Sequence, residues 1–130
     1  MNPRKKKPLD RSRQVRSTSE VFQDHLQKRK ASALEEDIQD NYDENIVLLT
    51  CIGIYRGHDG VRESAKVLTE SLPNSDFEYY NELVDGEFAF LEWRAFSDHK
   101  EVKEGADSFV IRGGKIVAQS IHYKVHPRTD

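Results

Sequence analysis

The chain has 130 residues, which suits one domain and leaves little room for a second. Apolar residues make up 36% of it, the mean hydropathy is −0.78, and no apolar run reaches the roughly 18 residues that a membrane-spanning helix needs. A single cysteine excludes an internal disulfide. We therefore expect a cytoplasmic globular domain and exclude a membrane protein or a secreted disulfide scaffold.

Charge is distributed unevenly along the chain. Residues 1–17 hold seven basic side chains and one acid, a net charge of +6, whereas the remainder carries −9. This arm has two prolines and almost no apolar residues, which predicts disorder. It either binds a partner such as RNA or an acidic surface or is simply solvated. The acidic folded part, expected at 18–126 with a tail at 127–130, argues against nucleic acid as its own partner.

The N-terminal half predicts helices around one strand. A Ser-x-x-Glu capping box at Ser17 precedes apolar positions at helical spacing, and a second box at Ser32 precedes another such series. The apolar run 46–51 predicts a strand covered on both faces, which continues through a bend. Asp59 is the predicted cap of a third helix that stops at Pro73.

The C-terminal half predicts strands alone, at 77–84, 88–96, 102–111 and 116–125. Helices first and an antiparallel meander last indicate an α+β fold, with the helices on one face of a curved sheet. The turn at Gly113-Gly114 allows two registers. A three-residue loop, which we favour, sets Asp107 opposite Gln119 and gives a concave layer of Asp107, Phe109, Val117, Gln119, Ile121 and Tyr123. A two-residue turn sets Ser120 opposite Asp107 instead.

Three motifs in this order resemble the nuclear transport factor 2-like (NTF2-like) superfamily, in particular its SnoaL-like and ketosteroid isomerase-like branch. They are Asn-Tyr-x-x-Asn-Ile-Val at 41–47, Gly-x-x-Gly-Val-Arg-Glu at 57–63, and Gly-Ala-Asp-Ser-Phe-x-Ile at 105–111 closed by Gly-Gly-Lys-Ile at 113–116. The resemblance implies a cone-shaped α+β barrel, in which a strongly curved, mostly antiparallel sheet wraps three helices around a pocket. Members include isomerases, cyclases, dehydratases and pure binding proteins, so the fold leaves the activity open.

The resemblance also implies roles for single residues. Asp107 falls where ketosteroid isomerases keep a protonated acid that donates a hydrogen bond to an enolate oxygen. Their general base falls at Thr50 or Leu49, neither of which can abstract a proton from carbon. Their tyrosine falls at His25 or Leu26. The steroid isomerase mechanism is therefore not expected here.

Candidate site residues follow from these alignments and from strand alternation. His25 is a candidate acid or base near neutral pH, with a satisfied core histidine as the alternative, and Asp107 is either the polarising acid or a structural carboxylate. Cys51 is expected to be buried and inert. No metal site is expected, because His122 and His126 stand about 13 Å apart on a strand, and no cofactor motif is present. The expected pocket wall is completed by Leu26, Thr50, Tyr55, Trp93, Phe109, Gln119 and Tyr123.

Strand 88–96 separates into two faces, with Trp93 on the pocket side and three phenylalanines, Phe88, Phe90 and Phe96, on the other. An exposed aromatic patch of this kind indicates an interface, and the resemblance implies dimerisation through it. We expect a homodimer that binds a small apolar carbonyl compound, with acid-base chemistry of the isomerase, cyclase or dehydratase type if it is an enzyme. The alternative is a non-catalytic dimeric interaction or scaffold module.

Overall fold

A computed structural model describes residues 15–128. Within them the chain forms three helices and a seven-stranded sheet, and the helices come from the N-terminal half. The elements in chain order are α1 (Thr18–Lys30), α2 (Leu34–Asn41), β1 (Tyr42–Thr50), β2 (Gly53–Arg56), α3 (Gly57–Ser71), β3 (Asp76–Asp85), β4 (Phe88–Phe96), β5 (Lys100–Arg112), β6 (Lys115–His122) and β7 (His126–Pro127). The predicted α+β class is confirmed.

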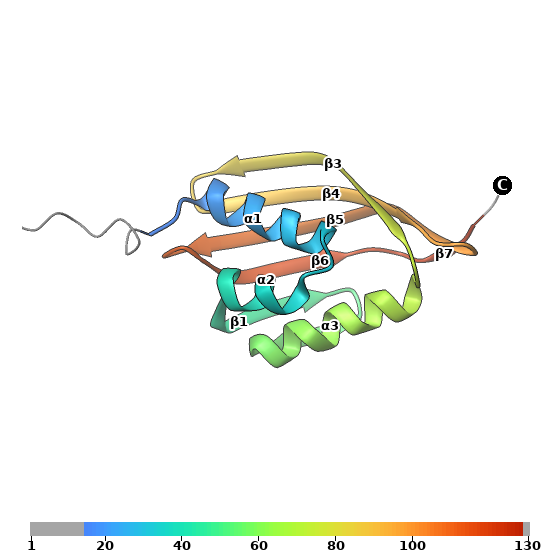
Figure 1. The fold of residues 1–130 in the computed structure, drawn as a ribbon, viewed down its shortest axis with the longest axis horizontal. Helices are drawn as coiled ribbons and strands as arrows, with labels where there is room; N and C mark the ends of the chain where they lie inside the picture. Colours follow the sequence, from blue (N-terminus) through green and yellow to red (C-terminus); the bar gives the residue numbers. More distant parts are fainter. Residues whose placement is uncertain (1–14, 129–130) are drawn as a thin grey trace, which may run out of the picture.

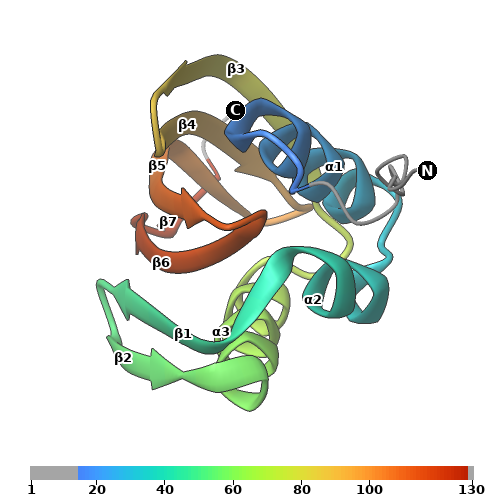
Figure 2. The ribbon, with the colours of Figure 1, turned by 90° about the vertical axis from the view of Figure 1, so that its left-hand side faces the viewer.

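The sheet runs in the order β2-β1-β6-β5-β4-β3, and β7 pairs with the start of β5. All neighbours are antiparallel except β1 and β6, which run parallel. The helices lie together on one face of this sheet (Figures 1 and 2). The expected strongly curved, closed cone is wrong: β2 and β3 are free edges at opposite ends of the strand order, so the sheet is open and not strongly curled.

The core lies between the helices and the inner face of the sheet. Strand β4 alternates between buried residues on this face and more exposed residues on the other, as its sequence predicts. Helix α1 supplies Val21, Phe22 and Leu26 to the same core. The N-terminus of α1 carries the predicted capping box, in which the Ser17 side chain accepts from the Glu20 amide and the Glu20 carboxylate accepts from the Ser17 amide.

Two other predicted caps are wrong. Ser32 has a positive φ of 57° in the turn between α1 and α2, and Ala33 precedes α2 without a side-chain cap. Helix α3 already begins at Gly57, so Asp59 lies in its first turn and pairs with Arg62. Neither helix start carries a side-chain cap.

The last hairpin follows neither predicted register near Asp107. Arg112 pairs with Lys115 across a two-residue Gly113-Gly114 turn, with both glycines at positive φ. A bulge then follows Ile116, so Asp107 pairs with Ile121. The bulge places Ile116 in the core and leaves Val117, which we expected there, half-buried.

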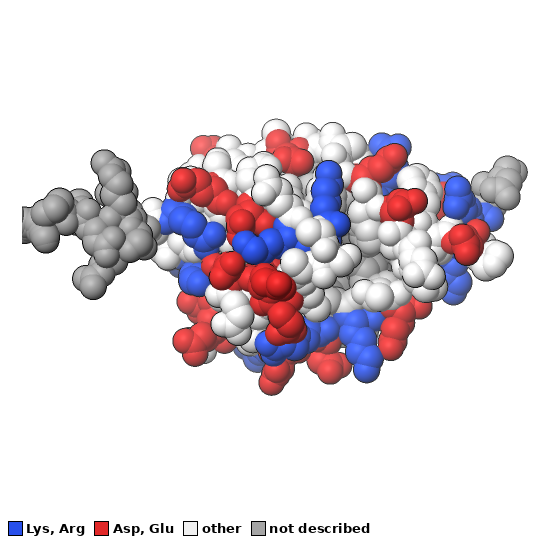
Figure 3. All heavy atoms as spheres, in the orientation of Figure 1, with Lys and Arg blue, Asp and Glu red and all other residues white. Residues whose placement is uncertain are grey.

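The N-terminal arm lies largely outside the described residues, which begin at Val15. Arg16 is held on the domain: its guanidinium donates to Asn41 Oδ1 at 2.9 Å, to the Asp40 carbonyl and to the Gly114 carbonyl. These bonds join the start of α1 to the end of α2 and to the β5–β6 turn. Acidic and basic side chains are interleaved on this helix face rather than separated (Figure 3).

Candidate functional site

A cavity of about 780 Å³ lies between the helices and the inner face of the sheet. All three helices and strands β1, β3, β4, β5 and β6 contribute to its wall, and the helix face of the molecule is hollowed beside α3 (Figure 3). Its wall mixes apolar side chains, among them Leu48, Leu68 and Leu91, with polar ones, some of which form a cluster on the sheet side. The residues that carry polar groups into this wall include His25, Arg29, Lys30, Tyr42, Tyr79, Trp93, Asp107, Gln119 and Tyr123.

Asp107, from β5, is the centre of the polar cluster, and its side chain is buried. Its Oδ1 accepts from Trp93 Nε1 at 2.9 Å and its Oδ2 accepts from Gln119 Nε2 at 3.0 Å. The Tyr42 hydroxyl donates to Gln119 Oε1 at 2.5 Å. Three strands thus join one chain of hydrogen bonds that runs from Tyr42 through Gln119 to the carboxyl group.

Burial is the largest influence on the Asp107 carboxyl and raises its pKa above the ordinary aspartate value. The hydrogen bonds from Trp93 and Gln119 and the charges of His25 and Arg29 act in the opposite direction but do not cancel it. Burial also raises the pKa of Tyr42, and it raises that of Tyr79 to about 12. Burial in the cavity wall therefore favours the protonated forms of Asp107, Tyr42 and Tyr79.

The position of Trp93 depends on Gly105, which pairs with it across β4 and β5. A Cβ at Gly105 would lie 2.3 Å from Trp93 Cε2, so the indole lies directly over the glycine. Phe77 and Tyr123 extend the aromatic wall, with ring centroids 5.4 and 5.9 Å from Trp93. The missing side chain at position 105 is what lets the indole reach the carboxylate.

His25, on α1, lines the cavity and contacts a buried carboxylate from α2. Its Nδ1 is 2.8 Å from Asp37 Oδ2 and 3.1 Å from Oδ1. Asp37 also accepts from Arg29 Nε at 2.7 Å and from Asn41 Nδ2 at 2.8 Å. Burial alone would raise the pKa of Asp37, but the hydrogen bond and charge of His25, the Arg29 charge and the Asn41 bond together lower it. Asp37 is thus held as a carboxylate.

The structure brings five of the nine predicted catalytic and pocket residues into this one wall: His25, Trp93, Asp107, Gln119 and Tyr123. Gln119 contacts Asp107 as expected, although the bulge in β6 makes the strand register differ from the predicted one. Three residues that the sequence analysis missed also belong here, namely Tyr42, Arg29 and Tyr79. Tyr42 had a usable signal, because it continues the four-residue apolar series of α2 into β1.

The other four predicted wall residues, Leu26, Thr50, Tyr55 and Phe109, are not among the residues that line this cavity. Leu26 packs in the core of the helix layer. The Thr50 hydroxyl accepts from the amides of the turn that follows β1, and Tyr55 lies on edge strand β2. Phe109 packs edge-on against Phe22 and His25, which fills the space it was expected to line. Cys51, expected to be buried, is exposed in the turn after β1.

Within residues 15–128, no group of three or more histidine, cysteine, aspartate or glutamate side chains is arranged to hold a metal ion. No helix of that same segment is long and apolar enough to cross a membrane.

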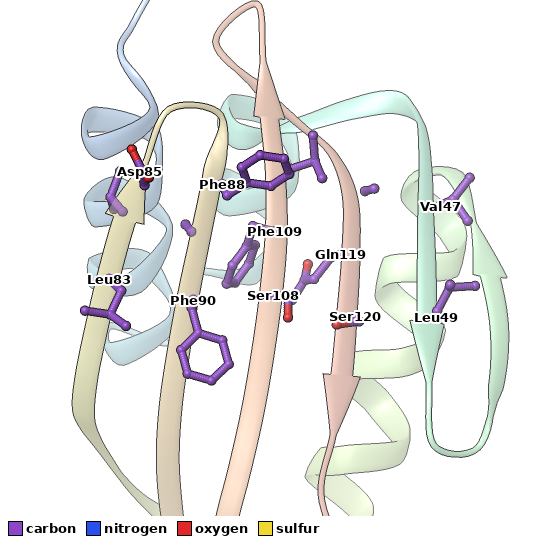
Figure 4. A pocket seen from close by; sticks show the side chains of 14 residues that line it. Val47, Leu49, Leu83, Asp85, Phe88, Phe90, Ser108, Phe109, Gln119 and Ser120 are labelled. Carbon is purple, nitrogen blue, oxygen red and sulfur yellow. The ribbon is translucent and has the colours of Figure 1, made fainter.

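A second hollow, of about 760 Å³, lies on the opposite face of the sheet, with the helices behind it (Figure 4). Apolar side chains from β1, β3 and β4 line it, and Ser108 and Ser120 lie at its centre. Leu49 is 52% exposed and Phe88 63% exposed, so the run 46–51 is covered on one face here, not on both as predicted. Phe88 and Phe90 lie in this groove, whereas Phe96 packs beside Arg128.

These observations define an α+β domain with helices on one face of a mixed sheet and a cavity between the two layers. A family model described as the SnoaL-like domain matches residues 20–119, and the chain belongs to this family. The resemblance proposed from the three sequence motifs is thereby confirmed. No curated protein sequence matches the chain.

Solved structures show the same fold at low identity. An NTF2-like protein of unknown function from Mesorhizobium loti is 21% identical with a TM-score of 0.70, over 91% of this chain and 97% of that one. A candidate isomerase of the SnoaL-like family from Agrobacterium tumefaciens is 17% identical with a TM-score of 0.65 (81% and 98% covered). A candidate ketosteroid isomerase from Kribbella flavida is 12% identical with a TM-score of 0.68 (87% and 82% covered). At these identities the likeness shows the fold alone.

Proposed function

We propose that the cavity binds a small, mostly apolar carbonyl compound with its carbonyl oxygen toward Asp107. The observation that carries this proposal is a carboxyl group that is buried in the cavity wall, where burial raises its pKa. A neutral carboxylic acid in such a setting donates a hydrogen bond to oxygen and stabilises negative charge that develops on it. The candidate isomerases among the structural neighbours are compatible with this chemistry.

The reaction class that suits these groups is enolisation, as part of an isomerisation, cyclisation or dehydration. His25 accepts a proton from the carbon next to the carbonyl, and the electrons of that C–H bond form the enolate carbon–carbon double bond. The negative charge moves to the carbonyl oxygen, where Asp107 donates its hydrogen bond. Return of the same proton from His25 to another carbon completes an isomerisation without a co-reactant.

A thermal-shift screen of steroid ketones and aromatic polyketide fragments tests this proposal. A compound at 100 times its Kd stabilises the fold by about 2.7 kcal/mol, which gives a clear shift in a domain of this size. We expect the shift to be lost in Asp107→Asn and kept in Ser108→Ala, a matched control on the neighbouring position that faces away from the cavity. An equal shift in wild type and Asp107→Asn removes Asp107 from the site. No shift in either protein favours the scaffold alternative.

We propose in addition that a second copy of the chain covers the groove on the outer sheet face. The supporting observation is that Leu49 on β1, Leu83 on β3 and Phe88 on β4 line this groove and are each more than half exposed. Sedimentation analysis should give a dimer for wild type and a monomer for Phe88→Glu. Ile54→Glu is the control, because Ile54 is 62% exposed on β2 but lies outside the groove. A wild-type monomer at micromolar concentration contradicts this proposal.

A further inference from the structure

We infer that Asp37 is a positioning residue, which fixes the His25 ring with its proton on Nδ1 and leaves Nε2 as the proton acceptor that faces a ligand. The inference deepens the proposed function and rests on it, because it names the residue that prepares the base. His25 and Asp37 come from different helices, and their side chains are 4% and 0% exposed. Their contact is therefore shielded from water and part of the core between α1 and α2.

The hydrogen bonds around Asp37 determine which group donates and which accepts in its contact with His25. Both of its oxygens accept: Arg29 Nε donates to Oδ2, Asn41 Nδ2 donates to Oδ1, and the histidine ring contacts both. An ionised carboxylate can only accept hydrogen bonds, so the His25 nitrogen that faces it must carry the proton. In a neutral imidazole the other nitrogen, Nε2, then has a free lone pair.

Arg29 lets Asp37 orient the ring without requiring it to be charged. The guanidinium already supplies the positive charge that a buried carboxylate needs, at 2.7 Å from Oδ2. Asn41 holds the other oxygen and is itself held by Asp24 and Arg16. Arg29 and Asn41 thereby fix the carboxylate from two sides, independently of the histidine.

Packing fixes the plane of the ring as well. Tyr42 and Phe109 lie edge-on to the His25 ring, with centroids at 5.8 and 5.3 Å. A ring flip would break the bond to Asp37 and disturb both contacts. Because His25 lines the cavity and Nε2 has no hydrogen-bond partner among residues 15–128, this nitrogen is the one left for a ligand.

This arrangement narrows the ligand class. The ligand must offer Nε2 a proton, from an acidic C–H beside the carbonyl or from a hydroxyl, while its oxygen faces the sheet. The proton of the ligand moves to the Nε2 lone pair, and the electron pair that bound it stays with the ligand as an enolate or alkoxide. A carbonyl compound without such a proton would bind less favourably.

Nitrogen NMR of the full chain, with ¹⁵N-labelled histidine and no ligand, tests the inference directly. His25, one of five histidines, is assigned through bonds to its backbone, and the shifts of its two ring nitrogens report which one carries the proton. A hydrogen bond to a charged group favours the Nδ1–H tautomer about tenfold or more. We expect this preference in wild type, and its reduction to about threefold or less in Asp37→Asn, whose amide can donate as well as accept.

Glu36→Gln is the matched control, because Glu36 precedes Asp37 on α2 but is exposed and does not touch His25. It should leave the preference unchanged. Neutral His25 with its proton on Nε2 in the wild type overturns the inference even if Asp37→Asn does not fold, and so does an unchanged preference in a folded Asp37→Asn. Failure of the ligand screen with the expected tautomer present contradicts the proposed function instead, so the two failures are distinguishable.

Discussion

Replacement of Gly105 by alanine tests how the cavity wall is built. The new Cβ would lie 2.3 Å from Trp93 Cε2 and 2.6 Å from Cδ2 and Cζ2, well inside the contact distance of about 3.5 to 4.0 Å for two carbons. The indole, which is 3% exposed, must move away from β5 and lose its bond to Asp107. Overpacking costs about 1 to 3 kcal/mol, and a buried acceptor without its donor costs about 1 to 3 kcal/mol more.

We therefore expect Gly105→Ala to lower the free energy of unfolding by about 2 to 6 kcal/mol, a large share of the 5 to 15 kcal/mol typical of a domain. Urea unfolding followed by circular dichroism measures it, with an unchanged m value as a check on the denatured state. In a Trp93→Val background the same substitution should change the free energy of unfolding very little, because the clashing ring is gone. A loss below about 0.5 kcal/mol, or an equal loss in both backgrounds, would refute the reasoning.

Three further outcomes follow from other contacts. Because the pKa of Asp107 is raised in the native state, stability should fall as pH rises from the unfolded aspartate value through the native one. Asp107→Asn should flatten that slope in urea unfolding at several pH values, and an unchanged slope contradicts the assignment. Arg16→Ala, which loses three hydrogen bonds, should cost about 1 to 3 kcal/mol, whereas Arg112→Ala at an exposed ion pair should leave the midpoint unchanged. Ser17→Ala should cost about 0.5 to 2 kcal/mol by loss of the N-cap, while Ser19→Ala, inside the helix, should show no loss; equal effects of the two would argue against the capping box.

Local sequence signals predicted a helix or strand well where a single pattern determines its bounds. The alternation in 88–96 gave the bounds of β4, and the capping box at Ser17 gave the start of α1. Ser32 has the same box pattern, but the chain must reverse between α1 and α2 within three residues. Ser32 takes up a left-handed conformation there, which removes it from the capping position. Tertiary geometry outweighed the local preference.

The register near Asp107 could not be read from sequence for a related reason. Two adjacent glycines fit more than one turn length, and a bulge is set by how the strand meets its neighbours on both sides. Strand β6 pairs with β1 as well as with β5, and the bulge lets Ile116 and Gln119 both face inward although they are three residues apart. Simple alternation would separate them onto opposite faces.

The buried polar residues on the central strands of the candidate site were predictable, whereas the partner of His25 was not. Asp107, Gln119 and Trp93 lie at alternating strand positions, where the face follows from the pattern. The partner of His25 is Asp37, which comes from another helix. In the sequence Asp37 looks like an ordinary solvent-exposed acid in the first turn of α2. Its complete burial depends on the angle between α1 and α2, which no spacing within either helix specifies.

The parallel pairing of β1 with β6 has a consequence for how the chain is made and folded. Thr50 pairs with Ile121, so β1 gains its second neighbour only after most of the chain has left the ribosome. Until then β1 can pair only with the short β2, and its apolar side chains can pack on α3. Contacts so distant in sequence are slow to close, and unpaired strand edges are open to aggregation meanwhile. A nascent chain that ends before β6 should therefore be the form that chaperones bind.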